Sequence, residues 1–286
     1  MNILWLGDSA SQDVLLVGGK AANLSKLAAD FCVPPGFCVT SAAYKTSLSN
    51  GSEKVRDIPK SLYDEIAGAY SRLGEMCGVN EPPVAVRSSG VGEDSSSAAF
   101  AGVHETYLNI RGPRQVAQSV AECWASAESQ VALHYRRRQA IDEQITIAVI
   151  VQQLVPAEVS AVAFSANPVT GNRDEVMINA SWGLGESIVG GTVTPDTYLV
   201  RKPDAIAMRD VADKECMTVL AEQGTHEVEV PLHKRRLPAL TDEQVVEVAR
   251  LAEDLERAMG WPVDIECAYH EGKLYLLQCR AITTLK

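Results

Sequence analysis

The sequence predicts a mixed α/β fold, because helix signals and strand signals both occur along the chain. The capping-box pattern at Thr241–Gln244 begins a helix, and Gly260 is suited to end it. Apolar runs indicate strands at 145–154, 160–165 and 175–180. Two alternating segments near the C-terminus, 262–269 and 273–281, indicate a β-hairpin.

The other elements follow from local breaks in the pattern. A helix is expected from Ala21 to Leu27, because Pro34 and Pro35 cannot continue it. Further elements are expected at 59–77 (helix), 84–86 (strand) and 113–139 (amphipathic helix). A polar Gly/Ser-rich loop runs from Arg87 to Gly102, and loops of that length inside compact domains are often functional.

Length and charge narrow the classes of protein that the chain can represent. The 286 residues are enough for one large domain or two lobes with a sizeable core. The net charge is −11, from 26 basic and 37 acidic residues, which argues against non-specific binding to nucleic acid or anionic membranes. No apolar run approaches the roughly 20 residues that span a bilayer.

Cysteine usage and the N-terminal segment indicate a cytoplasmic protein. Seven cysteines are scattered without a Cys-x-x-Cys pair, so reduced thiols are expected rather than disulfides or a zinc site. The first twelve residues lack a basic segment before their short apolar patch, so no secretion signal is expected.

The C-terminal hairpin carries the first candidate site. A three-residue turn at 270–272 would put Asp264, Glu266, Gln278 and Arg280 on one face, opposite the apolar residues. Carboxylate and amide oxygens suit Mg²⁺, and an adjacent arginine suits a phosphate carried by that metal. An ordinary solvated face with a cross-strand ion pair is the alternative interpretation.

Two further segments are suited to binding an anion. Gly18 and Gly19 precede a helix and expose N–H groups, and Lys20 follows them, although the pattern is not a Walker A loop. Arg87 stands at the end of a predicted strand, before the Gly/Ser-rich loop, in a plausible phosphate cradle. The alternatives are an exposed lysine after a flexible turn and a plain surface loop.

Together these segments resemble the N-terminal nucleotide-binding domain of the pyruvate phosphate dikinase, phosphoenolpyruvate synthase and rifampin phosphotransferase family. The motifs occur in family order over nearly the whole chain. They are Val17–Leu24, Val33–Phe37, Val86–Ser89, Ala99–Asn109, Val151–Gln152, Ala166–Pro168, Gly183–Glu186, Pro195–Tyr198, Asp264–Glu266 and Leu277–Arg280.

The resemblance implies an ATP-grasp-like fold, with ATP held between an N-terminal lobe of roughly 1–110 and a C-terminal lobe of roughly 111–286. It implies that Lys20 and Arg87 contact the ATP phosphates and that Gly102 and Thr106 lie in the loop that closes over them. Gln152 would lie near the adenine, and Glu186 would also contact the nucleotide. Glu266 and Gln278 would bind Mg²⁺, with Asp264 nearby, and Arg280 would contact the transferring phosphoryl group. Lys20, Arg87 and Arg280 are the expected catalytic residues.

Three positions depart from the family pattern. Ala161 stands in place of a frequent glycine, Ser165 in place of a threonine, and Cys267 in place of a common tryptophan after Glu266. These changes affect pocket walls or packing, so they bear on nucleotide preference and leave the metal chemistry intact.

The resemblance also implies the reaction. ATP would give its β-phosphoryl group to a histidine on a separate swivelling domain or partner, releasing AMP and phosphate. No phosphohistidine motif is recognised within the 286 residues, so that domain is expected elsewhere, in a longer chain or on another subunit. The alternatives are a stand-alone kinase that passes the γ-phosphoryl directly to a small molecule, and a non-catalytic nucleotide-binding subunit.

Overall fold

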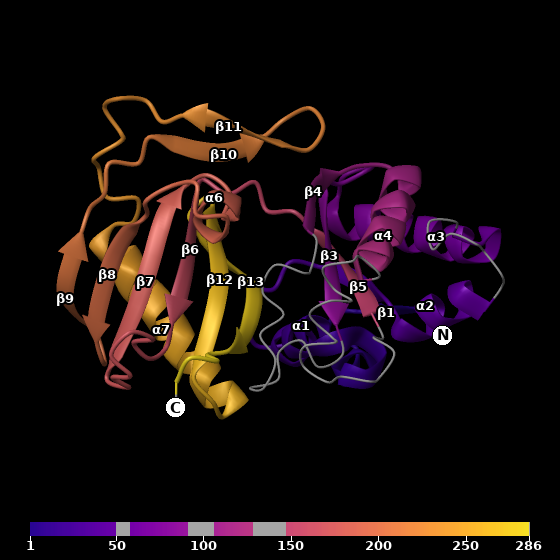
Figure 1. Cartoon of the computed structure of the whole chain (residues 1–286), viewed down its shortest axis with the longest axis horizontal. Coiled ribbons are helices and arrows are strands. Elements are labelled where there is room, and N and C mark those ends of the chain that lie inside the picture. The colour runs from indigo at the N-terminus through magenta and orange to yellow at the C-terminus, as the bar shows by residue number, and fades with distance from the viewer. Residues whose placement is uncertain (50–57, 91–105, 128–146, 286) are drawn as a thin grey trace. The chain divides into compact units, whose positions relative to one another are not determined.

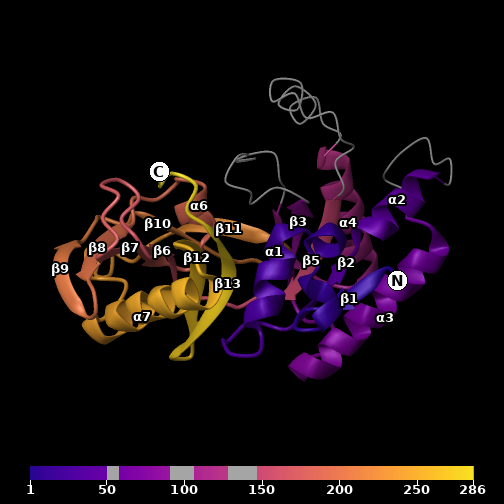
Figure 2. The same cartoon turned by 90° about the horizontal axis from the view of Figure 1, so that it is seen from below.

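The computed structural model describes residues 1–49, 58–90, 106–127 and 147–285, which form two compact units (Figure 1 and Figure 2). Unit 1 contains Met1–Asp30 and Pro34–Leu154, and unit 2 contains Phe31–Val33 and Val155–Lys286. The division after Leu154 differs from the boundary near residue 110 expected from the sequence. The strand that ends at Gln153 pairs in the middle of the unit 1 sheet, so it cannot belong to the other unit.

The described residues of unit 1 form a five-stranded sheet in which all neighbours are antiparallel. Its spatial order is β1 (Ile3–Trp5), β2 (Gly36–Val39), β5 (Ile147–Gln153), β3 (Val84–Gly90) and β4 (Thr106–Ile110). The central strand β5 is an almost unbroken run of buried apolar residues. Such a run is typical of a strand whose two faces are both covered.

Helices supply that cover. They are η1 (Ser9–Gln12), α1 (Val14–Leu27), α2 (Ser41–Ser49), α3 (Lys60–Cys77) and α4 (Pro113–Ala127). Val149 and Val151 of β5 pack with residues of α2, α3 and α4, whereas Ala148 and Ile150 pack with residues of α1. Alternate side chains of a strand point to opposite faces, so β5 holds two apolar layers together.

Unit 2 is built on an antiparallel six-stranded sheet with the long helix α7 (Asp242–Met259) along one face (Figure 1). The strands, in spatial order, are β13 (Lys273–Ala281), β12 (Val263–His270), β6 (Val159–Phe164), β7 (Glu175–Trp182), β8 (Asp196–Arg201) and β9 (Ala205–Asp210). A short helix α6 (Glu186–Val189) follows β7, and β10 (Cys216–Leu220) pairs with β11 (Thr225–Glu229) as a separate hairpin.

The mixed α/β prediction is confirmed, and several elements match closely. The predicted capping box of α7 forms, since the Thr241 hydroxyl accepts from the Gln244 amide at 3.3 Å and Gln244 Oε1 accepts from the Thr241 amide at 3.0 Å. Gly260 ends the helix at φ 78°. The helix predicted at 113–139 is described as far as Ala127, and its remainder lies outside the described residues.

Other elements differ from the prediction in their extent. Strand β3 continues to Gly90, so Arg87 lies within the strand and not at its end. Helix α1 begins at Val14, ahead of the two glycines, and is interrupted at Gly18. Strands β8 to β11 were not predicted, because their short mixed segments carry little periodicity.

The C-terminal hairpin forms, but by a different turn from the one expected. His270 pairs with Lys273, so the turn contains two residues, Glu271 and Gly272, at φ 50° and 74°. Positive φ at both positions is typical of tight hairpin turns. A bulge at Leu277 then shifts the register by one residue.

The bulge returns the four polar residues to one face, as an odd-length turn was expected to do, although the pairs differ from those of a three-residue turn, which would set Asp264 opposite Gln278. Asp264 pairs with Arg280 and Glu266 pairs with Gln278, so the four polar residues do fall together. The apolar face differs from the expected one, because Leu276 and Cys279 are buried whereas Tyr275 and Leu277 are not. Two buried residues three positions apart share a face only if a bulge separates them.

A buried ion pair lies at the edge of the unit 2 core. Asp196, the first residue of β8, and Lys214 have fully buried side chains, and Lys214 Nζ lies 2.5 Å from Asp196 Oδ1. The backbone amides of Ala212 and Ala239 also donate to this carboxylate, at 2.9 and 2.7 Å. The pair therefore ties β8 to both ends of the segment that carries β10 and β11.

We expect Lys214→Ala to lower the free energy of unfolding by about 3 kcal/mol, because it leaves the Asp196 carboxylate buried without its cation. Urea denaturation monitored by circular dichroism measures the change. The matched control is Arg250→Ala, which removes an exposed ion pair with Asp204 at 2.8 Å and is expected to change the free energy of unfolding far less. Equal losses in the two variants would contradict a special role for the buried pair.

Candidate functional site

In unit 1, the glycine pair lies against the end of β3. The backbone at Gly18 has φ 75° and ψ 169°, and a Cβ atom there would stand 2.2 Å from the Ser89 carbonyl oxygen. Only glycine tolerates both that dihedral and that approach. The Ala21 amide donates to Ser89 Oγ at 3.3 Å, so the start of the following helical segment is held to the strand.

This contact brings Lys20 to the strand that carries Arg87. Lys20 Nζ donates to the Ser88 carbonyl at 3.3 Å, and Ser88 follows Arg87 in β3. The bond orients the Lys20 ammonium. Both side chains are partly exposed, and two cationic residues at one strand suit a phosphate group.

Thr106 adjoins the same place, whereas Gly102 lies outside the described residues. Thr106 is the exposed first residue of β4 and is the cross-strand partner of Arg87. Lys20, Arg87 and Thr106 are thus brought to neighbouring positions from three distant parts of the sequence. The contacts of these residues with ATP phosphates stay a prediction.

Gln152 has a structural contact that sequence reasoning did not anticipate. Its side chain, 3% exposed in β5, donates from Nε2 to the Pro34 carbonyl at 3.2 Å. The bond fastens the chain just before β2 to the central strand. The expected place of Gln152 near the adenine therefore stays a prediction.

In unit 2, the hairpin of β12 and β13 arranges four polar residues as two cross-strand pairs, with the pair of Ile265 and Cys279 between them. Arg280 Nε donates to Asp264 Oδ2 at 2.8 Å, and Arg280 Nη2 lies 2.8 Å from the same oxygen in an ion pair. Burial raises the pKa of the Asp264 carboxyl, and the adjacent guanidinium opposes part of that rise. The Arg280 side chain is 45% exposed, so the buried carboxylate holds an arginine whose head faces solvent.

The second pair supplies oxygen ligands. Gln278 Nε2 donates to Glu266 Oε1 at 3.0 Å, which turns the amide nitrogen toward the carboxylate. Two carboxylates and an amide oxygen at alternate register positions are hard-oxygen groups of the kind that Mg²⁺ prefers, with waters or phosphate oxygens as its remaining ligands. Within the described ranges, no group of three or more His, Cys, Asp or Glu side chains could hold a metal ion.

Glu186 lies apart from the hairpin, at the first position of α6. Its carboxylate is exposed and accepts a hydrogen bond from Thr225 Oγ1 at 2.7 Å. Sequence reasoning missed Thr225, because it lies 39 positions away in a segment without a motif. Its only local signal is its place at the start of a short β-prone run.

The departures from the family pattern are packing positions. Ala161 of β6 and Cys267 of β12 are cross-strand partners, 3% and 1% exposed. Ser165 is fully buried, and its hydroxyl accepts from the Val263 amide at 2.9 Å, where β12 begins. Ala161 and Cys267 therefore pack inside the sheet beside the hairpin, and the Ser165 hydroxyl holds the start of β12.

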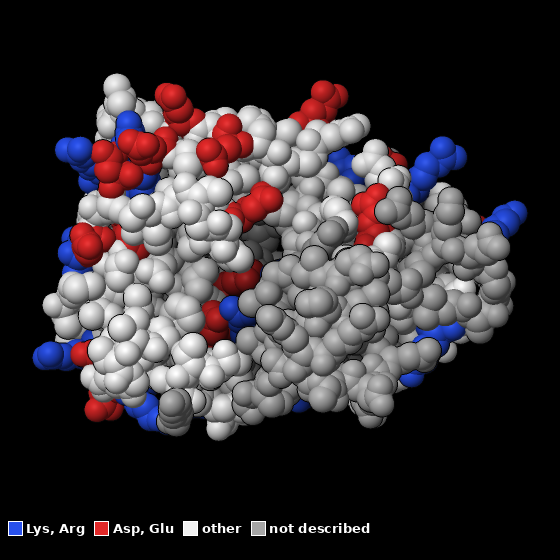
Figure 3. Space-filling view, viewed as in Figure 1, with Lys and Arg blue, Asp and Glu red and all other residues white. Residues whose placement is uncertain are grey.

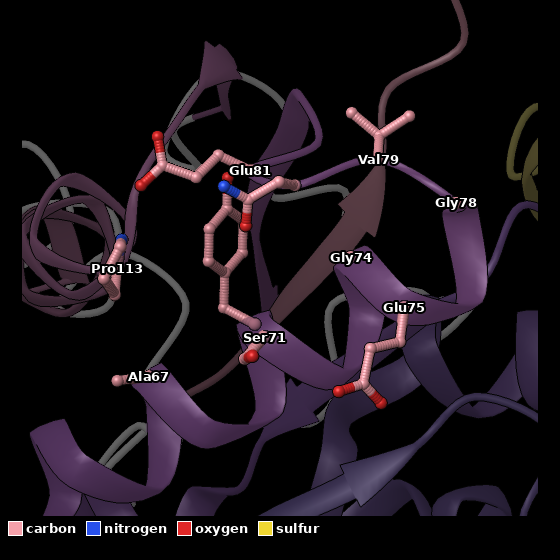
Figure 4. Close-up of a pocket in the computed structure, with 10 residues that line it drawn as sticks. Ala67, Ser71, Gly74, Glu75, Gly78, Val79, Glu81 and Pro113 are labelled. Carbon is pink, nitrogen blue, oxygen red and sulfur yellow. The ribbon is translucent and has the colours of Figure 1, made fainter.

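The described surface also carries dispersed charges and a hollow in unit 1. Figure 3 shows acidic and basic side chains interspersed over the described part of the face in view. The hollow, of about 490 Å³, lies beside α3, and its lining includes Tyr70, Asn80 and Pro113. Glu75 and Glu81 also belong to the lining (Figure 4). No residue of its lining was predicted to act. In the part of the chain that the structure describes, no helix is long and apolar enough to cross a membrane.

Comparison with known proteins gives consistent matches. A family model for the pyruvate phosphate dikinase AMP/ATP-binding domain matches residues 52–286. A probable phosphoenolpyruvate synthase from Methanocaldococcus jannaschii is 40% identical over 99% of this chain and 27% of its own length. The phosphoenolpyruvate synthase of Pyrococcus furiosus is 38% identical, with coverage of 99% and 44%. A rifampicin phosphotransferase from Streptomyces sviceus is 35% identical, with coverage of 99% and 36%.

These relatives are longer proteins. The chain spans between about a quarter and a half of the length of those it matches. Their names describe whole enzymes, and the aligned region is the part of each that corresponds to this chain.

We expect Gly18→Ala to lower the free energy of unfolding by about 2 kcal/mol or more, because the added Cβ combines positive φ with a backbone clash. The matched control is Gly68→Ala, in the exposed interior of α3, where a Cβ meets nothing within 4 Å. That change is expected to stabilise by up to about 1 kcal/mol. Denaturant titration compares the two, and effects of the same sign would contradict the close approach.

Proposed function

This chain belongs to the pyruvate phosphate dikinase AMP/ATP-binding domain family, and on that premise we propose that it binds ATP with Mg²⁺ and starts a phosphoryl transfer. Membership confirms the resemblance drawn from the motifs, and the helices and strands confirm the α/β class. In the proposed reaction, a histidine nitrogen on a separate domain attacks the β-phosphorus of ATP. The bond between the β-phosphorus and the AMP oxygen breaks, so AMP leaves and the histidine carries a diphosphoryl group. Water then attacks the γ-phosphorus and breaks the bond between the β- and γ-phosphoryl groups, which releases phosphate and leaves the phosphohistidine.

The observation that carries the proposal is the pairing in the β12–β13 hairpin. It sets an arginine held by a buried carboxylate on the same face as a carboxylate–amide pair, two register positions away. Phosphoryl transfer needs little covalent chemistry from the protein; it needs cations placed where charge develops on the phosphoryl oxygens. The hairpin offers one such cation and the ligands for another.

Each group has a proposed task. Glu266 and Gln278 would hold Mg²⁺, with Asp264 close by, and the ion would neutralise charge on the phosphate oxygens when bound. Arg280 would contact the transferring phosphoryl group, oriented by its hydrogen bond and ion pair with Asp264. Asp264 thus acts mainly by positioning Arg280.

The unit 1 groups also have proposed tasks. Lys20 and Arg87 would contact the ATP phosphates, with Thr106 beside Arg87. Their support is the bond that anchors Lys20 to β3, the strand of Arg87, and the pairing of Arg87 with Thr106. The acceptor histidine would be supplied by another part of a longer protein or by a partner, since the relatives extend well beyond the matched region.

We expect Arg280→Ala to keep ATP affinity within about threefold and to lower phosphoryl transfer at least 100-fold, because its main task is in the transition state. Calorimetry gives the affinity, and chromatography of AMP, ADP and phosphate, with a histidine domain from a relative added, gives the transfer. Arg250→Ala, in the exposed pair with Asp204, is the matched control and should change neither.

The products decide between the reactions. AMP and phosphate that appear only with the histidine domain support the proposed half-reaction, whereas ADP formed with a small-molecule acceptor supports direct γ-transfer. Binding without any transfer by the wild-type chain would favour a non-catalytic subunit. Full transfer by Arg280→Ala would remove Arg280 from the catalytic set.

We expect Glu266→Gln to weaken ATP binding about tenfold or more in Mg²⁺, and to have little effect when EDTA removes the metal, because the carboxylate would act through the ion. Titration of ATP at several Mg²⁺ concentrations measures the linkage. Glu229→Gln, an exposed glutamate in β11, is the control for loss of one negative charge. An equal loss with and without Mg²⁺ would exclude Glu266 as a ligand.

A further inference from the structure

The β10–β11 hairpin is attached to the turn that carries Glu186, and neither strand belongs to the main sheet of unit 2. We propose that this hairpin positions the Glu186 carboxylate for the nucleotide, and that Thr225 is the positioning residue. The inference rests on the proposed function, because it takes ATP as the ligand that Glu186 meets. It adds a residue and an element to which no motif assigns a role.

The hairpin docks on the backbone of the turn. The Leu184 amide donates to the Thr218 carbonyl of β10 at 2.9 Å, and Gly183 also forms a bridge with Thr218. A Cβ at Gly183 would stand 2.4 Å from the Thr218 carbonyl oxygen, and its φ is 75°. The glycine therefore permits a backbone-to-backbone contact that a larger residue would push apart.

A side-chain hydrogen bond between Thr225 and Glu186 lies beyond this docking point. Thr225 begins β11 and pairs with Leu220 at the end of β10. Its hydroxyl donates to Glu186 Oε2 at 2.7 Å. Glu186 is exposed at the start of a four-residue helix, where an unrestrained side chain would sample several rotamers. A short hydrogen bond to a charged acceptor limits that freedom.

The base of the hairpin, just before β10 and after β11, is anchored to the core of unit 2. The buried Asp196 carboxylate holds Lys214 just before β10 and the Ala239 amide after β11. The Lys214 amide also donates to the Arg235 carbonyl at 3.0 Å, which joins the two sides of the segment. The hairpin is thus fixed at its base and at the turn, so Thr225 is presented from an anchored element.

The chemistry of Glu186 indicates which part of ATP it would meet. A carboxylate accepts hydrogen bonds and is repelled by phosphate oxygens, so its partners are the hydroxyl or amino groups of the nucleoside. Orientation by Thr225 then affects nucleotide affinity rather than the phosphoryl step. A hairpin that served only to stabilise unit 2 would affect melting and leave affinity unchanged.

The experiment is a double-mutant cycle on the full chain, with the ATP dissociation constant measured by calorimetry and folding checked by thermal melting. We expect Thr225→Val to weaken ATP binding about fivefold, through loss of a hydrogen bond to a charged group. Thr225→Ser, which keeps the hydroxyl, should bind within about twofold of wild type. In a Glu186→Gln background, Thr225→Val should add less than about a twofold further loss.

Thr218→Val is the matched control, since it makes the same substitution in the same hairpin, where the backbone holds the turn. It should leave ATP affinity unchanged. Unchanged affinity in Thr225→Val, or the same fivefold loss in the Glu186→Gln background, overturns the inference. If Thr225→Val melts early, Thr225→Ala and Thr225→Ser give the same comparison.

The proposed function fails in a different way. A wild-type chain that does not bind ATP removes both the proposed function and the inference. Binding by wild type that is weakened by Lys20→Ala but indifferent to Glu186→Gln and Thr225→Val keeps the proposed function and overturns the inference alone.

Discussion

The pairing of β12 with β13 is the contact on which the candidate chemistry of unit 2 depends. A two-residue turn brings the strands together, and the bulge at Leu277 then sets Asp264 opposite Arg280 and Glu266 opposite Gln278. Without the bulge, the register would move by one residue and the polar pairs would be lost. An irregularity in a strand therefore decides whether an arginine and the oxygen ligands act at one place.

Burial strengthens this arrangement. Burial raises the pKa of Asp264, and the hydrogen bond and ion pair from Arg280 oppose part of that rise. A charge held in a low-dielectric setting orients its partner strongly. Arg280 itself stays nearly half exposed, so it can be both well oriented and reachable by a phosphate group. The buried carboxylate therefore orients the Arg280 guanidinium more strongly than an exposed carboxylate would.

Unit 1 uses a glycine where unit 2 uses a bulge. Gly18 lets α1 approach β3 closely enough for Ala21 and Lys20 to bond with the serines after Arg87. The turn at Gly183 repeats the principle, because it admits the β10 backbone and thereby brings Thr225 to Glu186. In each unit, a glycine allows a close backbone approach, and a charged side chain nearby, Lys20 or Glu186, is held by a hydrogen bond as a result.

Local patterns in the sequence were enough to predict the elements with strong periodicity or capping. The capping box of α7, the helix at 59–77, the central strands and the polar content of the hairpin were predicted, because each depends on residues close in the chain. The motifs also identified the family, since ten short patterns in order rarely arise by chance.

The tertiary structure decided what depends on distant contacts. The bulge at Leu277, the burial of Lys214 on Asp196 and the bond from Thr225 to Glu186 join residues that no local pattern relates. The division after Leu154 follows likewise from β5 pairing between two strands far earlier in the chain. Side-chain type limits which chemistry is available, whereas register and burial determine which of those side chains meet.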